Sequence, residues 1–255
     1  MFAEQRHQAI IQKINREKSI KASDLMELFG VSFETVRRDL EHLEKVGYLK
    51  RVHGGAILKE WDYREEIPMT VREKAHLDGK NELSEIAARY VTEGQSIALD
   101  VSTTNTQFVK ALKKKIERLT VITNSLPIAN ELVPMPGYTI ILIGGVIRNE
   151  EQGMIGDLAE EFASRFHADL FFMSMSGVTL TEGVTDYGLG EVQMKKIMLK
   201  NAKRTIALAD SSKFEAVSLI KVCGCAEIER FVTDSNIDPA IVDKYKKHGV
   251  EIVYQ

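Results

Sequence analysis

The sequence predicts an α/β protein in which a small N-terminal winged helix-turn-helix is joined to a larger α/β domain with a mainly parallel sheet. Three observations lead to this prediction. Within residues 1–58, three helical patterns precede a hairpin centred on two glycines. From Gln95 onward, apolar strands alternate with helical segments. The 255 residues, 44% of them hydrophobic, also suffice for two domains of unequal size.

Three helices are expected in the N-terminal domain, because apolar residues recur there at helical spacing. The first helix is predicted from about Ala3 to Arg16. The second begins near Ala22 or Ser23 and stops at Gly30, where the chain turns sharply. Across the three helices, the residues predicted to face the core are Ile10, Ile11, Ile14, Leu25, Leu28, Val36, Leu40 and Leu43.

The third helix begins after Ser32, whose side chain can cap it, and ends at Gly47. In the segment "YLKRVHGGAIL" that follows, Gly54 and Gly55 lie between apolar residues and predict a small two-stranded hairpin. Helix, helix, tight turn, helix and hairpin in this order predict a winged helix-turn-helix over residues 1–58.

The rest of the chain is expected to contain a linker and one large domain. Residues 59–79 mix charge, a proline and the only tryptophan without sustained periodicity, so we expect a linker there and the larger domain over 80–255. Apolar strands are predicted in "SIALD", "LTVITN", "YTIILIGG", "LFFMSMSG" and "TIALAD", separated by helical segments. The chain closes as strand, helix and strand in "IERFVTD", "DPAIVDKYKKHG" and "VEIVYQ".

The lengths of the apolar runs and the two cysteines indicate the cellular compartment and whether a metal or cofactor is bound. The sequence has no uninterrupted apolar run of about 18 residues, and its charged, amphipathic N-terminus differs from a signal peptide. We therefore expect a cytoplasmic protein with no membrane partner. Cys223 and Cys225 lie too close in sequence for an unstrained disulfide and supply too few ligands for zinc. We expect them to be structural, with no bound metal and no cofactor.

The net charge of −3 is unevenly distributed along the chain. Residues 1–58 carry ten Lys and Arg against eight acids, a balance of +2, which leaves −5 for the remaining residues. This modest asymmetry fits a small anion-binding domain attached to a mildly acidic one.

The third helix and the hairpin form the expected DNA-binding surface. In a helix-turn-helix, the leading end of this helix enters the major groove, where Arg can pair with guanine and the helix N-terminus favours phosphate. The hairpin would reach the flanking backbone or minor groove. An ordinary exposed helix with i,i+4 pairs, such as Arg37 with Glu41, is the alternative. The residues expected to contact a double-stranded DNA operator are Ser32, Phe33, Glu34, Thr35, Arg37, Arg38, Lys50, Arg51 and His53.

Several N-terminal motifs occur together at the start of the chain. They are Arg6 followed by Ile10 and Ile14, the turn "FGVS", and the block "TVRRDLEHLEKVGYLKRVHGGA". With these motifs, the segment resembles the DNA-binding domain of the DeoR family of bacterial transcription regulators. Met26 departs from the general helix-turn-helix pattern, in which a small residue often lies four places before the turn glycine.

Several predicted strands of the larger domain end in short polar or glycine-containing loops. Because the carboxyl ends of parallel strands share one edge of the sheet, these loops predict a pocket for a small polyhydroxylated anion. Each loop also has a structural alternative as a helix cap, a bend or a surface turn, and neither GxGxxG nor a P-loop indicates a nucleotide. The candidate residues are Asp100, Ser102, Thr103, Thr104, Thr123, Asn124, Ser125, Gly144, Gly145, Arg148, Asp210 and Lys213.

The motifs "VITNSLPIANEL", "ILIGGVIR", "GEVQMKKIM", "LADSSKF" and "VTD" extend the resemblance to the effector domain of the DeoR family. That domain is related in fold to ribose-5-phosphate isomerase and glucosamine-6-phosphate deaminase. The resemblance implies a phosphorylated sugar or sugar alcohol as effector, with Ser102 to Thr104 and Lys213 holding its phosphate. The other residues that it implies in or near the pocket are Asn124, Gly145, Glu191 and Lys195.

Catalysis is not expected, because isomerisation of a sugar phosphate needs a carboxylate base beside the reacting carbons. The related isomerases carry acids in the loop after the strand that matches "FFMSMSGV", and here that loop has none. Ser176 stands where DeoR regulators usually have an aspartate, so we include it in the pocket and expect it to influence which sugar is accepted. Glu191 is the nearest candidate base, but it also fits an amphipathic helix.

Together, these features predict a transcription regulator that represses a carbohydrate-utilisation operon under the control of a phosphorylated sugar. We expect a homodimer or homotetramer, because one short helix makes few base contacts and symmetric half-sites raise affinity. The alternative function is a sugar-phosphate isomerase or deaminase-like enzyme fused to a DNA-binding domain.

Overall fold

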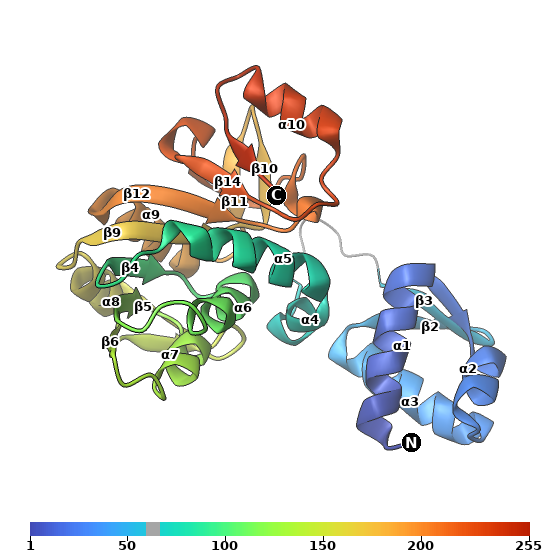
Figure 1. Cartoon of the computed structure of the whole chain (residues 1–255). Helices are drawn as coiled ribbons and strands as arrows, with labels where there is room; N and C mark the ends of the chain where they lie inside the picture. The colour runs from blue at the N-terminus through green and yellow to red at the C-terminus, as the bar shows by residue number, and fades with distance from the viewer. Residues whose placement is uncertain (60–66) are drawn as a thin grey trace. The chain divides into compact units, whose positions relative to one another are not determined.

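The structure is a computed structural model that describes residues 1–59 and 67–255 (Figure 1). Contacts divide the chain into two compact units, Met1–Ala75 and His76–Gln255. The boundary falls within the expected linker 59–79, of which residues 60–66 lie outside the described residues. Much of the remaining span is helical, since helix α4 covers Met69–Lys74 and helix α5 begins at Leu77.

The first unit contains the expected helices and hairpin, with one further strand. Its elements are α1 (Ala3–Glu17), β1 (Ser19–Lys21), α2 (Ala22–Phe29), α3 (Phe33–Val46), β2 (Leu49–Val52), β3 (Gly55–Leu58) and α4. Strand β1 pairs antiparallel with β3, so the predicted two-stranded hairpin is part of a three-stranded sheet. A Cβ atom at Gly55 would lie 2.1 Å from the carbonyl oxygen of Ile20. Gly55 therefore permits the close approach of β1.

The predicted core of the first unit is confirmed with one exception. Seven of the eight predicted positions are buried, among them Leu25, but Leu28 is 58% exposed. The prediction for Leu28 is wrong because Met26 and Phe29, on the same short helix, pack against the core instead. Gly30 and Gly47 end α2 and α3 in the left-handed conformation, as predicted.

The second unit is built on a sheet of seven strands that pair in parallel throughout. The sheet strands are β4 (Ser96–Leu99), β5 (Leu119–Thr123), β6 (Tyr138–Leu142), β9 (Ala168–Ser174), β12 (Ala202–Leu208), β14 (Arg230–Val232) and β15 (Ile252–Val253). All seven were predicted from apolar runs. The short strands outside this sheet were not predicted: β7 (Val146–Arg148), β8 (Gly153–Ile155), β10 (Gly177–Thr179), β11 (Gly183–Asp186) and β13 (Ile220–Cys223).

Helices cover both faces of this sheet (Figure 1). Helices α5 (Leu77–Ala87), α6 (Thr103–Leu112) and α7 (Leu126–Leu132) pack in the core that contains Ile97 and Leu99 of β4. Helices α8 (Asp157–Ala163), α9 (Leu189–Asn201) and α10 (Pro239–Lys246) contribute to the opposite core, which contains Ala98. Successive residues of β4 thus face opposite layers, as buried parallel strands require.

The strand order β15-β14-β12-β9-β4-β5-β6 reverses direction between β4 and β9. From β4 the chain adds strands toward β6, and from β9 it adds strands toward β15. In such sheets, ligands bind outside the carboxyl ends of the strands at the point of reversal. The topology therefore directs attention to the residues that follow β4 and end β9.

Cys223 is buried, Cys225 is partly buried, and both are free thiols. Burial raises the pKa of the Cys223 thiol to about 12 and also raises that of Cys225. Across residues 1–59 and 67–255, no helix combines the length and apolar character needed to cross a membrane.

Candidate functional site

Helix α3 exposes one face of its first two turns to solvent. Ser32 Oγ accepts the N–H of Thr35 at 3.3 Å and caps the helix, as predicted. Phe33 is 55% exposed, and the side chains of Arg37 and Arg38 are 45% and 75% exposed. These residues are therefore available to a partner from the leading end of α3.

Glu34 holds both arginines in the free protein. Its carboxylate accepts two hydrogen bonds of 2.9 Å from Arg37 and one of 3.2 Å from Arg38. Glu41 lies 3.3 Å from the Arg37 guanidinium on the next turn. The hydrogen bonds from Arg37 lower the pKa of Glu34 to about 2. The ion pairs expected of an ordinary exposed helix are thus present, and a DNA phosphate would have to compete with Glu34 for these arginines.

The three predicted hairpin residues differ in their surroundings. Lys50 and His53 are exposed. Arg51 is held against α3, since its Nε donates to Glu44 Oε2 at 2.7 Å and its backbone N–H donates to Glu44 Oε1 at 2.8 Å. These contacts fix the hairpin on the end of α3, so Arg51 has a structural role that the sequence did not predict.

Arg6 and Asp39 form a buried ion pair between α1 and α3. Arg6 donates to the two carboxylate oxygens of Asp39 at 2.7 and 3.0 Å, and His7 Nε2 lies 3.0 Å from the same carboxylate. Both members of the pair are at most 9% exposed. Sequence reasoning singled out Arg6 only as part of a motif and missed Asp39, although Asp39 is adjacent to the buried Leu40.

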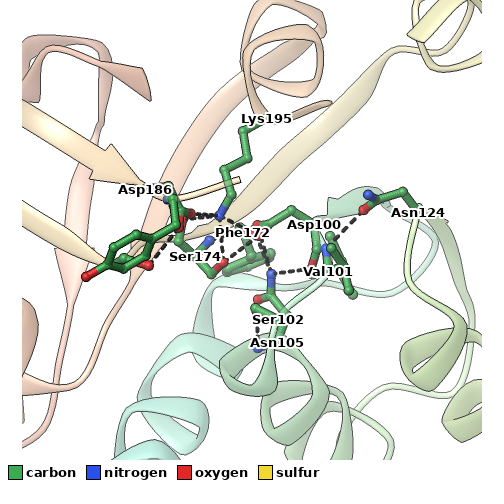
Figure 2. Close-up of polar contacts among 12 residues, drawn as sticks. Asp100, Val101, Ser102, Asn105, Asn124, Phe172, Ser174, Asp186 and Lys195 are labelled. Atoms are coloured by element: carbon green, nitrogen blue, oxygen red, sulfur yellow. Dashed lines mark hydrogen bonds and ion pairs between the residues drawn. The ribbon is translucent and has the colours of Figure 1, made fainter. Parts of the chain in front are cut away.

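At the strand reversal of the second unit, a polar cluster joins β4 to β9 (Figure 2). Asp100 directly follows β4, and its Oδ1 accepts the backbone N–H of Ser174 at 2.8 Å. Asn105 on α6 donates to Asp100 Oδ1 at 3.1 Å and to the carbonyl oxygen of Phe172 at 2.9 Å. The carboxylate of Asp100 is therefore fixed between the two strands, where the topology predicts a ligand.

Lys195 of α9 is the centre of this cluster (Figure 2). Its Nζ lies 2.8 Å from Asp100 Oδ2 and 2.7 Å from Asp186 Oδ2, and the side chain is only 2% exposed. Burial acts to lower the pKa of Lys195, but Asp100 and Asp186 outweigh it, so the pKa is raised. For Asp186, burial acts to raise the pKa and Lys195 outweighs it, so the pKa is lowered. Ser176 Oγ donates to Asp186 at 2.7 Å, which places this predicted residue beside the cluster.

A second set of polar groups surrounds the N-terminus of α6. Ser102 caps this helix by accepting the N–H of Asn105 at 2.9 Å. Lys80 of α5 donates from Nζ to Thr103 Oγ1 at 3.2 Å and is 3% exposed. Thr104, also predicted, is buried in the same first turn. Sequence reasoning missed Lys80, which it treated only as the first residue of the larger domain.

Asp210 and Lys213 belong to the same region. Burial acts to raise the pKa of Asp210, but Lys213, His76, a hydrogen bond from Ser212 and Lys80 together lower it. Asp210 also caps the short 3₁₀ helix Ser211–Lys213 by accepting the N–H of Ser212 at 3.2 Å. The two lysines, at distant positions in the sequence, are thus both close enough to act on one carboxylate.

Four predicted residues support the scaffold. Asn124 accepts the N–H of Val101 and donates to the carbonyl of Met154, each at 3.0 Å. Thr123 Oγ1 donates to the carbonyl of Leu99, and Ser125 caps α7. At Gly145, a Cβ atom would lie 2.8 Å from Ala159 Cβ, so glycine is needed for the packing of α8. Gly144 has open space around it.

Glu191 lies at the start of α9, 93% buried, and Arg148 Nη1 is 3.1 Å from its Oε1. Neither carboxylate oxygen of Glu191 has a hydrogen-bond partner of suitable geometry. A buried carboxylate of this kind can accept hydrogen bonds from a ligand's hydroxyl groups. Within the described parts of the chain, no group of three or more His, Cys, Asp and Glu is arranged to hold a metal ion.

An exposed recognition helix in a winged helix-turn-helix, joined to an α/β domain with a charged cluster at its strand reversal, defines a transcription regulator with a sensor domain. Comparisons with known proteins agree. Residues 6–61 match the family model described as a DeoR-like helix-turn-helix domain, and residues 75–235 match that of the DeoR C-terminal sensor domain. The chain belongs to the DeoR family.

The relatives are similar over nearly their whole length. The chain is 35% identical over 252 residues to the uncharacterized HTH-type transcriptional regulator YulB of Bacillus subtilis, covering 99% of this chain and 96% of that protein. It is 26% identical to the glycerol-3-phosphate regulon repressor of Escherichia coli K12, with 97% of each chain covered. Ribose 5-phosphate isomerase A of Methanocaldococcus jannaschii is similar in structure with a TM-score of 0.40 at 18% identity, over 54% of each chain.

Proposed function

We propose that this protein represses a carbohydrate-utilisation operon in the cytoplasm and responds to a phosphorylated sugar or sugar alcohol. The observation that carries the proposal is the charged cluster at the strand reversal, in a chain whose other unit exposes a recognition helix. The name of the Escherichia coli relative, a repressor of a glycerol-3-phosphate regulon, supports both the sign of regulation and the class of effector.

The chemistry of the cluster suits a ligand with one anionic end and one hydroxylated end. Lys80, Lys213 and the N-terminus of the ten-residue helix α6 would attract the phosphate. On the other side, the carboxylates of Asp186 and Glu191 can accept hydrogen bonds from sugar hydroxyl groups. Glu191 supports this orientation, because its buried carboxylate has Arg148 at 3.1 Å but no hydrogen bond of suitable geometry, and a buried carboxylate is costly unless something donates to it.

DNA binding is assigned to the first two turns of α3 and to the exposed hairpin residues. Arg37 and Arg38 would exchange Glu34 for phosphate or guanine, which is favourable only where DNA offers a well-placed acceptor. Lys50 and His53 would reach the flanking backbone. Because Arg51 is held by Glu44, we propose that it positions the hairpin and makes little direct contact with DNA.

We propose further that the protein is not an enzyme. Of the carboxylates nearest the strand reversal, Asp100 and Asp186 both form ion pairs with Lys195. The residues that end β9 and follow it, Ser174 to Gly177, include no acid. Glu191 is the remaining candidate base, but Arg148 Nη1 lies 3.1 Å from its carboxylate, and one carboxylate without an acid partner is a poor arrangement for aldose–ketose isomerisation.

A screen for thermal stabilisation tests the effector. Glycerol 3-phosphate, glucose 6-phosphate and fructose 1-phosphate would each be titrated against the full chain, with the unphosphorylated compounds as controls. A compound that binds only the folded state stabilises it and so raises the melting temperature. At a concentration one hundred times Kd, the stabilisation is about 2.7 kcal/mol. If phosphorylated and unphosphorylated compounds act alike, the phosphate assignment is wrong.

DNA binding is tested by selecting fragments from a random pool and titrating salt. Neutralisation of phosphates gives a log-log slope of about −0.9 for each contact. We expect the selected sites to be palindromic, because a homodimer or homotetramer presents two recognition helices related by symmetry. A salt-independent affinity would indicate that the N-terminal unit binds protein instead, and turnover of a sugar phosphate would favour the enzyme alternative.

A further inference from the structure

The two units are joined through the peptide bond between Ala75 and His76. His76 has φ of 52°, a left-handed conformation that residues other than glycine seldom adopt. Helix α4 ends immediately before Ala75, and α5 begins immediately after His76. The connection between the two helices is thus two residues long.

Helix α4 is fixed to the DNA-binding unit. Val71 is 8% exposed and belongs to the same core as the residues of α1, α2 and α3. The hydroxyl of Tyr48 donates to the carbonyl of Thr70, and Lys74 Nζ lies 5.7 Å above the Tyr48 ring. Tyr48 in turn donates its N–H to the carbonyl of Leu43 on α3, at 2.9 Å. A displacement of α4 is therefore transmitted to the end of the recognition helix.

Helix α5 begins at the candidate effector site. The backbone N–H of Lys80 donates to the carbonyl of His76 at 3.0 Å, so Lys80 lies on the first turn after the junction. The Lys80 side chain reaches Thr103 at the N-terminus of α6, and His76 itself contributes to the lowered pKa of Asp210. One helical turn thus separates the junction from the groups that would hold a phosphate.

We propose that Lys80 senses the anionic group of the effector and that His76 transmits its position to α4 and the recognition helix. This inference rests on the proposed function. A phosphate bound beside Thr103 would compete for the Lys80 ammonium and so bias the first turn of α5. The two-residue junction then passes that bias to α4. A ligand can shift the arrangement of the DNA-binding unit only if it prefers one state of this turn.

The test lengthens the junction and keeps both binding surfaces. The sequence Gly-Ser-Gly-Ser is inserted between Ala75 and His76 of the full chain, and the same insertion between Thr181 and Glu182, in the turn that joins β10 to β11, is the control. The affinity for a DNA fragment selected from a random pool is measured with and without glycerol 3-phosphate, glucose 6-phosphate or fructose 1-phosphate. The affinity for each compound is measured by calorimetry.

We expect the junction insertion to keep the affinity for DNA and for the phosphorylated compound separately. In coupled proteins, one ligand typically changes the affinity for the other 5- to 150-fold. In the junction variant, the phosphorylated compound should no longer change the affinity for DNA. The control insertion should retain it. His76→Gly, which relieves the left-handed strain and loosens the junction, should reduce the coupling in the same direction and provides the answer if the insertion does not fold.

Undiminished coupling in both junction variants would overturn the proposal.

For Lys80, we expect that Lys80→Met weakens binding of the phosphorylated compound and of inorganic phosphate at least tenfold, while Lys80→Arg retains most of the affinity. Equal affinities in the two variants would overturn its sensing role. If the unmodified chain binds DNA but none of the three phosphorylated compounds, the proposed function itself fails. If a compound binds and still changes the affinity for DNA after the insertion, only the proposal for the junction fails.

Discussion

Replacing Lys195 with methionine isolates the contribution of the buried charge cluster. The ammonium of Lys195 is 2% exposed and lies within 2.8 Å of carboxylate oxygens of both Asp100 and Asp186. Methionine is similar in length but leaves the buried Asp100 and the partly buried Asp186 without their common partner. Removing one member of a buried ion pair typically costs about 3–5 kcal/mol. We expect a loss at the upper part of that range at pH 7, because two carboxylates are affected.

The free energy of unfolding of the second unit is measured in urea, with Lys196→Met as the matched control. Lys196 is the next residue on the same helix and is exposed, so its loss should change stability by no more than about 0.5 kcal/mol. A Lys195→Met variant that loses less than about 1 kcal/mol, a value typical of exposed ion pairs, would refute the view that this cluster is buried and mutually dependent.

The pH dependence of the same variant gives a second check. In the unmodified chain the pKa of Lys195 is raised, so its contribution is complete below its ordinary value of 10.5 and is lost only at higher pH. The pKa of Asp186 is lowered, so its contribution is present above its ordinary value of 3.8 and is lost in acid. The difference between the two proteins should therefore be constant near neutral pH. It should shrink in acid, where the contribution of Asp186 is lost.

Three other predictions follow from the sites. Arg37→Ala or Arg38→Ala should weaken binding to the selected DNA by about 1–3 kcal/mol and relax site preference if either residue contacts a base; unchanged affinity in both would contradict the assignment of α3 to the groove. Lys213→Ala should weaken binding of the phosphorylated compound in calorimetry, and a normal Kd would place the phosphate elsewhere. Arg6→Met should destabilise the first unit in urea by about 3 kcal/mol or more, since it leaves the Asp39 carboxylate buried; Asp39→Asn should cost a similar amount, as it leaves the Arg6 guanidinium buried without its counter-charge.

The fold was largely predictable because its main elements carry apolar stretches or helical periodicity. Each of the seven parallel strands contains an apolar stretch, and Val36, Leu40 and Leu43 recur at helical spacing. What could not be predicted is short or depends on distant partners. Strand β1 has only three residues and forms because β3 returns beside it, and Leu28 is exposed because its neighbours fill the space.

The candidate site was only partly predictable, for a related reason. Residue type and position after a strand are visible in the sequence, so Asp100 and Asp210 were found. Which of these residues contact one another depends on strand order. Lys80 and Asp186 were missed because each comes from an element that the sequence does not link to the pocket. Asn124 was included among the candidates, but in the structure its side chain bonds to main-chain groups of the scaffold.

The pairing of Arg37 and Arg38 with Glu34 also has a consequence for how the protein searches a genome. Arginines that already have an intramolecular partner gain little from an arbitrary stretch of duplex, since every phosphate contact costs an existing bond. Weak attachment to random sequence leaves more molecules free to find their operator. If Arg37 and Arg38 contact DNA as proposed, Glu34 would thus lower the background of unproductive binding and increase the difference in affinity between the operator and other sequences.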